Sequence, residues 1–421
     1  MPIEVDLKER VAFLTADVDS IDPDSPDWNL KHIEANRANP FLYTIKLDPS
    51  EWKLRRIEVD PQNPHFCSID GVLYTKDVKT LVRVPCRRQK EVTVPPGVET
   101  VGPSACKNCI FTSIVLPDSV TRIEDKAFFM CPSLQSVNLG AGVESIGKQA
   151  FNECFRLKSV VFSKALKKIG AGAFDYCHGL GRISIPEGVV SIESRAFDNC
   201  LLESVTFPES LRTIGPYAFR YNRFKSLELP KNLTKIGKNA FQFCPKLESV
   251  SLPRGIKSIA EGAFGNCASL EKIDLPDGAG FYRMRDGVLF GDGGKTLLWR
   301  APLHPVRQYA VPAGVTKIGA FAFGHSFVET VSLPDGLETI EKDAFSECFM
   351  MTQIDVPNTV KTIGHRAFES CFSLKEIVIP DGIESIGYHA FDDCRILVIR
   401  GSKSSYAEEY AAKNEIEFKP L

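Results

Sequence analysis

An Ala-Phe pair that returns every 22 or 23 residues constrains this chain more than any other feature. A fixed period of this length is typical of a solenoid, because one such coil cannot bury its apolar side alone and must stack on its neighbours. The sequence therefore predicts a continuous ladder of similar coils. The pairs lie at residues 127–128, 150–151, 173–174, 196–197, 218–219, 240–241, 263–264, 322–323, 344–345, 367–368 and 390–391.

The residues around each pair predict the contents of one coil. An Ile and often a Gly precede the pair, a Cys follows three residues after the Phe, and a segment such as "LESVSLP" at 247–253 comes next. Alternating apolar residues closed by Pro predict a short strand. A second short strand is expected at segments such as 143–146, and one tight helical turn at the Ala-Phe pair. The fold class is thus a β-rich α/β solenoid of about 12 coils of 22–23 residues.

Stacked coils place like side chains over one another, which gives the recurring Phe and Cys residues a structural role. Ten of the 13 cysteines follow the repeat, and Asn222 and Ser326 fill two further rungs. A buried thiol behaves as a small hydrophobe, although neighbouring coils are close enough for some disulfides. The predicted core ladder includes Phe128, Phe151, Phe174, Phe197, Phe241, Phe264, Cys131, Cys154, Cys177 and Cys200.

The pair Cys106 and Cys109, in "ACKNC" at 105–109, has the spacing of a redox centre or of half a zinc site. The repeat offers a simpler interpretation. Cys106 stands 22 residues before Phe128 and follows Ala105, so it occupies an aromatic position, while Cys109 occupies the ordinary Cys position. We therefore interpret the pair as a coincidence of register.

Two segments interrupt the repeat and share a pattern. Residues 66–85 and 281–302 each carry Asp-Gly between apolar runs, at 70–71 and 286–287, which predicts a β-hairpin insertion in each. "GGKT" at 293–296 is reminiscent of a phosphate-binding loop. However, Leu289 stands where that motif needs its first Gly, so we interpret the segment as a turn.

The two ends depart from the repeat. Residues 1–50 contain the aspartate-rich "ADVDSIDPDSPDW", but an EF-hand starting at Asp17 would need Gly at Asp22 and Glu at Trp28, so an acidic N-terminal cap segment is expected. The solenoid is predicted at 51–400. Residues 401–421 are predicted to form a capping helix and a last strand, which cover the end of the core.

Composition excludes several classes of partner. The formal charge of −2 and the balance of 51 basic against 53 acidic residues give no overall field to attract nucleic acid. No run of about 18 apolar residues is present, so no membrane insertion is expected. The first residues, "MPIEVDLKERVAFL", lack the pattern of a secretory signal, and the chain as written is expected in the cytoplasm.

The frame Ile-Gly-x-x-Ala-Phe-x-x-Cys-x-x-Leu-x-x-Ile-x-Ile-Pro resembles the BspA-type leucine-rich repeats. The resemblance covers residues from about 55 to 421, including "DGVLY" at 70–74 and "SYAEEYAAKNEIEF" at 405–418. It implies a right-handed leucine-rich repeat superhelix with two hairpin insertions and terminal caps. Members of that family are typically secreted or surface-attached and associated with adhesion, aggregation or binding of host proteins, so the resemblance also implies a cell-surface or secreted location.

Catalysis and cofactors gain no support from the sequence. None of the seven histidines has zinc-ligand spacing, and His178, His325, His365 and His389 fall at variable positions of the coil, where solvated side chains are expected. Ser136, Ser159, Ser204, Ser226 and Ser249 recur at one strand position, whereas a nucleophile needs a unique group beside a base. We expect no enzyme, no cofactor and no metal.

The outward strand positions provide a polar face of mixed charge. The leading hypothesis is a non-enzymatic protein-protein recognition scaffold, with adhesion as its finer form, whose partner and oligomeric state stay open. The alternatives are a passive structural or spacer module and, less favoured, a metal or redox protein. The candidate binding face comprises Gln135, Asn138, Arg182, Ser204, Glu248, Lys272, Asp274, Gln353, Asp355 and Glu376.

Overall fold

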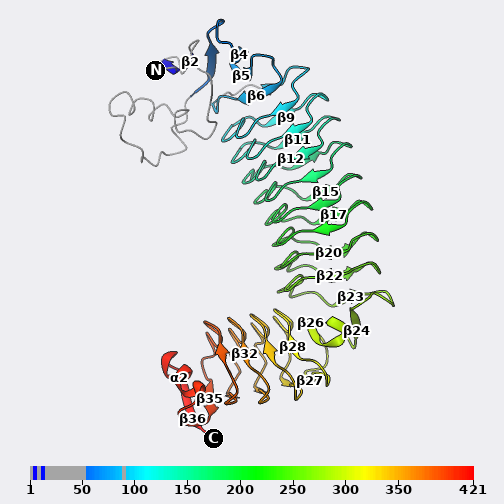
Figure 1. Cartoon of the computed structure of the whole chain (residues 1–421), viewed down its shortest axis with the longest axis vertical. Helices are drawn as coiled ribbons and strands as arrows, with labels where there is room; N and C mark the ends of the chain where they lie inside the picture. Colours follow the sequence, from blue (N-terminus) through cyan, green and yellow to red (C-terminus); the bar gives the residue numbers. More distant parts are fainter. Residues whose placement is uncertain (1–2, 7–10, 15–53, 88–91) are drawn as a thin grey trace. The chain divides into compact units, whose positions relative to one another are not determined.

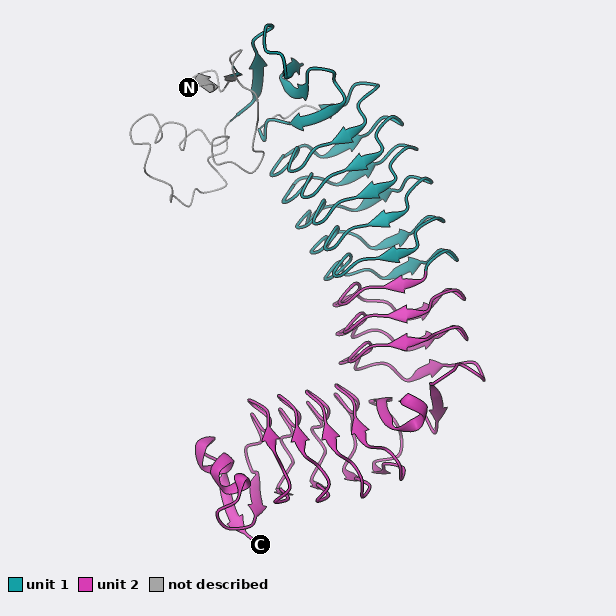
Figure 2. Cartoon of the chain, viewed as in Figure 1, with its two compact units in different colours: residues 1–211 teal, residues 212–421 magenta. Residues whose placement is uncertain are grey.

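The structure is a computed structural model that describes residues 3–6, 11–14, 54–87 and 92–421. Its contacts divide the chain into two compact units, residues 1–211 (unit 1) and 212–421 (unit 2), which Figure 2 colours separately. In each unit the strands of successive coils lie parallel and side by side (Figure 1). The predicted solenoid is confirmed as a parallel β-solenoid of about 15 turns, more than predicted because some coils lack the Ala-Phe pair.

Unit 1 begins with small sheets and continues as two parallel ladders. β1 (Ile3–Asp6) pairs antiparallel with β2 (Val11–Leu14), which pairs with β3 (Arg56–Val59). The hairpin strands are β4 (Phe66–Ile69), β5 (Val72–Thr75) and β6 (Thr80–Arg83). One ladder contains β8 (Thr100–Val101), β10 (Arg122–Ile123), β12 (Ser145–Ile146), β14 (Lys168–Ile169) and β16 (Ser191–Ile192). On the other side, β7 (Val92–Thr93), β9 (Ser113–Val115), β11 (Ser136–Asn138) and β13 (Ser159–Val161) form one parallel sheet, and β15 (Arg182–Ser184) and β17 (Ser204–Thr206) form a second.

Unit 2 repeats this arrangement but is interrupted by the second hairpin. The first coils hold β18 (Thr213–Ile214), β20 (Lys235–Ile236) and β22 (Ser258–Ile259), with β19 (Ser226–Glu228), β21 (Ser249–Ser251) and β23 (Lys272–Asp274). The hairpin follows as β24 (Arg283–Arg285), β25 (Val288–Gly291), η3 (Asp292–Gly294) and β26 (Thr296–Arg300). The later coils hold β28 (Lys317–Ile318), β30 (Thr339–Ile340), β32 (Thr362–Ile363) and β34 (Ser385–Ile386), with β27 (Gln308–Ala310), β29 (Thr330–Ser332), β31 (Gln353–Asp355) and β33 (Glu376–Val378).

Both hairpins form as predicted, and the C-terminal end carries the expected helix and strand. Asp70 and Gly71 have φ of 51° and 74°, and Asp286 and Gly287 have 50° and 72°, the positive values that a tight hairpin turn needs. The final strands are β35 (Val398–Gly401) and β36 (Glu417–Pro420), with α2 (Tyr406–Lys413) between them. Among the described residues α2 is the one α-helix, so "α/β" overstates the helical content.

The prediction of a helical turn at the Ala-Phe pair is wrong. In each coil, turns with left-handed residues replace it, such as Lys126 and Met130 with φ of 56° and 54°. Alternate N–H groups bond to the next coil rather than within a helix, and Phe128 N donates to Ala150 O at 2.7 Å. These bonds form a third intercoil ladder, which satisfies backbone groups that a buried turn would otherwise leave unpaired.

The core consists of columns of identical side chains. In unit 1, Phe128, Phe151, Phe174 and Phe197 stack with ring centroids 4.8–5.2 Å apart and nearly parallel planes. In unit 2, Phe241 and Phe264 stack at 5.6 Å, and a second column starts at Phe323 after the hairpin. All ten residues of the predicted core ladder are buried, as are the other Phe residues of these columns.

Where glycine follows the Ile of the second strand, the neighbouring coil leaves no room for a side chain. A Cβ at Gly170 would lie 2.7 Å from the carbonyl carbon of Gly147, and a Cβ at Gly387 would lie 2.3 Å from the backbone nitrogen of His365. Both contacts are to backbone atoms, which cannot rotate away. At these two positions the Gly therefore allows the close approach of the neighbouring coil.

The expected division into a cap at 1–50, a solenoid at 51–400 and a cap at 401–421 stays a proposal. Most of the acidic segment, including Asp17, Asp22 and Trp28, lies outside the described residues, as does His32. Leu14 is buried, and the backbone of β2 pairs with β3.

Candidate functional site

The three-residue strands present a row of outward side chains, which we call the outer face. In each strand the middle residue points inward and its two neighbours point away, as in β11, where Val137 is buried while Ser136 and Asn138 are not. We define the outer face as the first and third residues of these strands together with the residue that precedes each strand. It exists separately in unit 1 and in unit 2.

The structure places every predicted binding residue on the outer face but does not gather them into one site. Four lie in unit 1 and six in unit 2, so they form two sets. In unit 1, the exposed members are Gln135, Asn138, Arg182 and Ser204. In unit 2, Glu248, Lys272, Gln353, Asp355 and Glu376 are exposed, and Asp274 is half-buried.

From β9 to β17 the outer face of unit 1 carries three charges: Arg182 within a strand, and Lys158 and Glu203 at positions that precede a strand. From β9 to β17 the outward strand positions carry Ser, Thr, Asn and Val, apart from one cation, Arg182. Val115 and Val161 are 63% and 58% exposed, so aliphatic groups meet solvent between the hydroxyls. Among the described residues, the side chains of Arg182 and of the exposed Lys158 make no ion pair.

Several charges on the outer face of unit 2 are already paired within the protein. Lys272 Nζ lies 2.8 Å from Asp274 Oδ1 within β23. Other pairs join successive coils. These are Lys225 with Glu248 at 3.6 Å, Arg307 with Glu329 at 3.7 Å, and Arg400 with Glu376 at 3.4 Å.

The ladder thiols have a specific role that the sequence did not reveal, since each donates a hydrogen bond to the backbone of the preceding coil. Their acceptors are mostly the carbonyl oxygens of the Phe residues. Within the described ranges, these oxygens accept no backbone N–H group from the neighbouring coil, so they can accept the thiol hydrogen. Burial raises the pKa of Cys200 well above its usual range and that of Cys348 to about 12. The bonds run from Cys154 to Phe128 O (3.1 Å), Cys177 to Phe151 O (3.1 Å), Cys200 to Phe174 O (2.9 Å), Cys267 to Phe241 O (3.1 Å) and Cys371 to Phe345 O (3.2 Å).

Cys106 occupies the aromatic position that the repeat assigned to it. Its N–H donates to Ala127 O at 2.7 Å, as Phe128 N does to Ala150 O, and its carbonyl accepts from the Cys131 thiol at 3.0 Å. All 13 cysteines are free. The sequence interpretation of Cys106 and Cys109 as a coincidence of register is therefore consistent with the structure.

Two buried arginines, one beside each hairpin, were missed. Arg83 ends β6 and its Nη1 donates to Ser104 O at 2.6 Å. Arg300 ends β26 and its Nη1 donates to Ser326 Oγ at 2.8 Å. The signal available in the sequence was their position, since Arg83 stands one period before Ala105 and Arg300 one period before Ala322.

Histidines and serines form no catalytic arrangement in the described part of the chain. His325 Nδ1 lies 3.0 Å from Glu347 Oε2, and His389 contacts Asp392, so both rings pair with carboxylates rather than serines. Among the described residues, no group of three His, Cys, Asp or Glu is placed to hold a metal ion.

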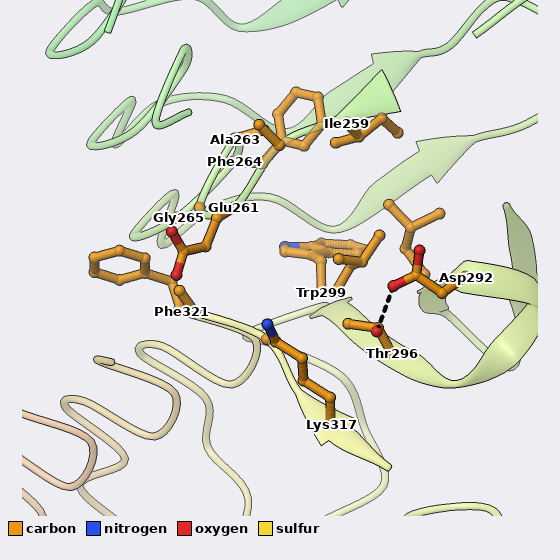
Figure 3. A pocket seen from close by; sticks show the side chains of 16 residues that line it. Ile259, Glu261, Ala263, Phe264, Gly265, Asp292, Thr296, Trp299, Lys317 and Phe321 are labelled. Atoms are coloured by element: carbon orange, nitrogen blue, oxygen red, sulfur yellow. Dashed lines mark hydrogen bonds between the residues drawn. The ribbon is translucent and has the colours of Figure 1, made fainter. Parts of the chain in front are cut away.

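A hollow of about 190 Å³ lies in unit 2, where the second hairpin interrupts the ladder (Figure 3). Its walls include Trp299 and Phe321, and the Phe321 ring covers Gly265 so closely that a Cβ there would meet its Cγ at 2.7 Å. The Asp292 carboxylate accepts from Thr296 Oγ1 at 2.6 Å. Glu261 pairs with Lys238 at 2.8 Å. These carboxylates have partners within the protein, and the hollow is a packing gap without a group poised for chemistry.

The match to known proteins lies in the repeat region of the chain. The sequence matches the family described as "BspA type Leucine rich repeat region" in 6 copies, over residues 85–181, 167–284 and 304–417. Among curated proteins, none matches significantly. In the described part of the chain, no helix has the length and apolar character needed to cross a bilayer.

Two solved structures share the fold. A leucine-rich cell surface protein from Faecalibacterium prausnitzii A2-165 is 25% identical with a TM-score of 0.64, over 85% of this chain and 95% of that one. A leucine-rich repeat protein from Eubacterium ventriosum is 21% identical with a TM-score of 0.50, over 64% and 67% of the two chains. Because the family match spans well over half of its residues, this chain belongs to the BspA-type leucine-rich repeat family.

Proposed function

We propose that the chain is a non-enzymatic protein-binding scaffold, located at a bacterial cell surface, that captures its partner on the outer face of unit 1. The family supports a binding scaffold, and the similar Faecalibacterium prausnitzii protein is described as a cell surface protein. The observation that carries the proposal is Arg182, an exposed cation that makes no ion pair with any described residue, on a face whose other charges from β9 to β17 are Lys158 and Glu203.

The physical reason for choosing unit 1 is the cost of removing water. An aliphatic group gains on desolvation and a hydroxyl needs a single hydrogen bond in return, whereas a charge must regain a much larger hydration free energy from the partner. Several charges of unit 2 already compensate one another, as Lys272 and Asp274 do. An Arg that is not engaged can form two hydrogen bonds to a carboxylate of the partner and thereby fix its register.

Charge reversal at matched positions tests this proposal. Immobilised wild-type chain, Arg182→Glu and the control Lys272→Glu would be exposed to the same extracts of host cells and of bacterial surfaces. We expect a defined protein to be retained by wild type and by Lys272→Glu and lost from Arg182→Glu, with unchanged melting in all three. Equal retention by Arg182→Glu would exclude the outer face of unit 1.

The finer proposal of adhesion and the alternative of a passive spacer give different results in the same experiment. An adhesin retains a protein of the host surface, whereas a spacer retains nothing specific from any extract. A metal or redox protein would contain stoichiometric metal after purification, which elemental analysis measures directly.

A further inference from the structure

The hydrogen-bonded ladders of the solenoid stop together in unit 2, at the coil of residues 256–274. β22 is the last strand of one sheet and β24 the first of the next, and β23 and β27 are separated in the same way. Among the described residues, no hydrogen bond between two backbone groups joins residues 256–278 to residues 281–421. The coil of residues 256–274 therefore has no successor in the ladders.

A tyrosine hydroxyl takes the place of the missing coil. Ile259 N, in β22, donates to Tyr282 Oη at 2.6 Å. The same arrangement recurs later in unit 2, where Ile386 N donates to Tyr406 Oη at 3.4 Å. This second bond is made in β34, which is also the last strand of its sheet. Both sheet ends are thus closed by the same chemistry, which satisfies a backbone donor that no further coil accepts.

The second hairpin starts a ladder in the way that the first hairpin does. β6 pairs parallel with β8, and β26 pairs parallel with β28. Each hairpin shifts register at the same point of its middle strand, between Leu73 and Tyr74 in one and between Leu289 and Phe290 in the other. Each also ends at a buried arginine. Because the first hairpin precedes the first coils, the matching second hairpin marks another beginning.

The contact across this junction is made by side chains and is incompletely packed. The Phe321 ring lies over Gly262 and Gly265, and all three residues line the hollow of about 190 Å³ (Figure 3). By contrast, β30 pairs with β32, β31 pairs with β33, and the Phe345 and Phe368 rings stack at 5.2 Å. The stability of a solenoid is a sum over its coils and the interfaces between neighbours, so a weak interface divides it.

We propose that residues 281–421 are a second solenoid module with its own caps, and that Tyr282 closes a joint at residues 275–280 between this module and the coils before it. The second hairpin is the N-terminal cap of the module, and α2 and β36 are its C-terminal cap. The two sides of the joint then unfold separately, so one can open while the core of the other stays intact. This inference does not depend on partner capture.

Buried thiols of the ladder report on each side of the joint in one full-length sample. Cys244 and Cys267, the earlier thiols, lie before the joint, and Cys348 and Cys371, the later thiols, lie after it. All four are buried, so each should be protected from iodoacetamide until its own coil unfolds. The purified chain would be equilibrated in increasing urea, treated briefly with iodoacetamide and analysed by peptide mapping. This measurement gives a urea midpoint for each thiol.

Phe323→Ala removes the first stacked ring after the joint. It should lower the urea midpoints of both later thiols, of which Cys371 lies two coils away, because unbroken ladders couple these coils. It should leave Cys267 unchanged, although Cys267 belongs to the coil directly before the joint. If Phe323→Ala unfolds the second module outright, the later thiols react without urea, and the earlier thiols should still be protected.

Phe264→Ala is the reciprocal variant, since this ring is the last of its column. It should lower the midpoints of both earlier thiols and leave the later thiols unchanged. A shift of Cys267 in Phe323→Ala, or of Cys348 in Phe264→Ala, would overturn the proposal, because the joint would then transmit stability. An unchanged Cys371 midpoint in Phe323→Ala would also overturn it, because the module would then not unfold as one.

Tyr282→Phe tests the closing bond itself. The substitution leaves Ile259 N without its acceptor, so the urea midpoint of Cys267 should fall by about 0.5 M. Tyr406→Phe is the matched control, since it removes the same kind of bond beyond the joint and should leave Cys267 unchanged. A Cys267 midpoint in Tyr282→Phe equal to that of wild type would show that Tyr282 does not close the joint.

Discussion

The outer faces of the two units are built from the same strands but differ in how they present charge. In unit 1, from β9 to β17, Arg182, Lys158 and Glu203 stand among uncharged side chains. In unit 2 charged side chains of both signs are more numerous, and pairs such as Arg400 with Glu376 link one coil to the next. The backbone therefore does not determine the chemistry of this surface. The chemistry of the surface is determined by the side chains at the outward positions, which make no core contacts and can therefore differ from coil to coil.

The difference also supports the proposal that a partner binds the face of unit 1 rather than that of unit 2. A charge that is paired within the protein must give up that pair before it can bind a partner. A charged group of a partner would therefore add little binding free energy at the face of unit 2. Exposed pairs of this kind contribute about 0–1 kcal/mol to stability. The face of unit 1 has fewer charges, but they are available.

The largest effect is expected in the core, where the two units should behave alike. Phe174→Ala and Phe345→Ala should each lower the free energy of unfolding by about 3–5 kcal/mol, because each ring packs between two others and leaves a cavity. Urea denaturation measures the loss. Phe155→Ala, at a 41% exposed ring, is the control and should cost much less. If only one of the two substitutions strongly lowered the free energy of unfolding, the cores of the two units would not be equivalent.

The second prediction tests whether coil spacing is equally tight in both units. Gly387→Ala and Gly170→Ala should each cost about 1–3 kcal/mol, because the new methyl would meet backbone of the preceding coil. Thermal melting measures the cost. Gly181→Ala is a matched control in unit 1, since a Cβ there meets no atom within 4 Å. A neutral Gly387→Ala would show that the coils of unit 2 can move apart.

The third prediction concerns Asp343 in unit 2, which directly precedes an Ala-Phe pair. At the same position unit 1 carries no carboxylate but Lys126, Gln149, Gly172 and Arg195. Burial raises the pKa of Asp343 from 3.8 to about 6. The folded state therefore binds the proton more tightly than the unfolded state, and this contribution to stability, complete below pH 3.8, is lost as the pH rises through 6.

Asp343→Asn should consequently stabilise the protein at neutral pH. We expect a gain of about 1 kcal/mol at pH 7, reduced from the full shift because the carboxyl is partly solvated. The gain should vanish near pH 4. Melting temperatures of wild type and Asp343→Asn between pH 4 and pH 8 measure it, with the exposed Asp335→Asn as control. A constant difference across this range would contradict the assignment.

The smallest effect on stability is expected at the outer face itself. Arg182→Glu and Lys272→Glu should each change the free energy of unfolding by no more than about 0.5 kcal/mol, because both side chains are exposed. Of the two, Lys272→Glu should be slightly the more destabilising, since it places a like charge beside Asp274. If Arg182→Glu proves clearly the worse, the cation has a structural partner and the contrast between the faces weakens.

Much of the fold could be predicted from the sequence because identical residues recur at one spacing. The columns headed by Phe128, the hairpin turns at Asp70 and Asp286, and the terminal helix follow from spacing and turn chemistry alone. The Ala-Phe turn was predicted wrongly because the alternation of left-handed residues depends on bonds to the next coil, such as Phe128 N to Ala150 O, which a single coil does not reveal.

The candidate site was predictable only in part. Alternation along each strand identified exposed residues such as Asn138 and Glu376. It did not show that Arg400, one coil later, neutralises Glu376. Arg83 and Arg300 were missed because neither belongs to an Ala-Phe pair, although each stands one period before the Ala that begins a block, at Ala105 and Ala322.

The intercoil bonds have a consequence for how such a chain can change in evolution. A coil supplies its own thiol donor, as Cys177 does, and its own acceptor, as Phe174 does, so a duplicated copy arrives with its hydrogen bonding complete. Gain or loss of a whole period leaves every junction as it was, whereas removal of a few residues misaligns all three ladders at once. The length of the molecule can thus change in evolution by whole coils, and the outer face can be extended without any change to the interior.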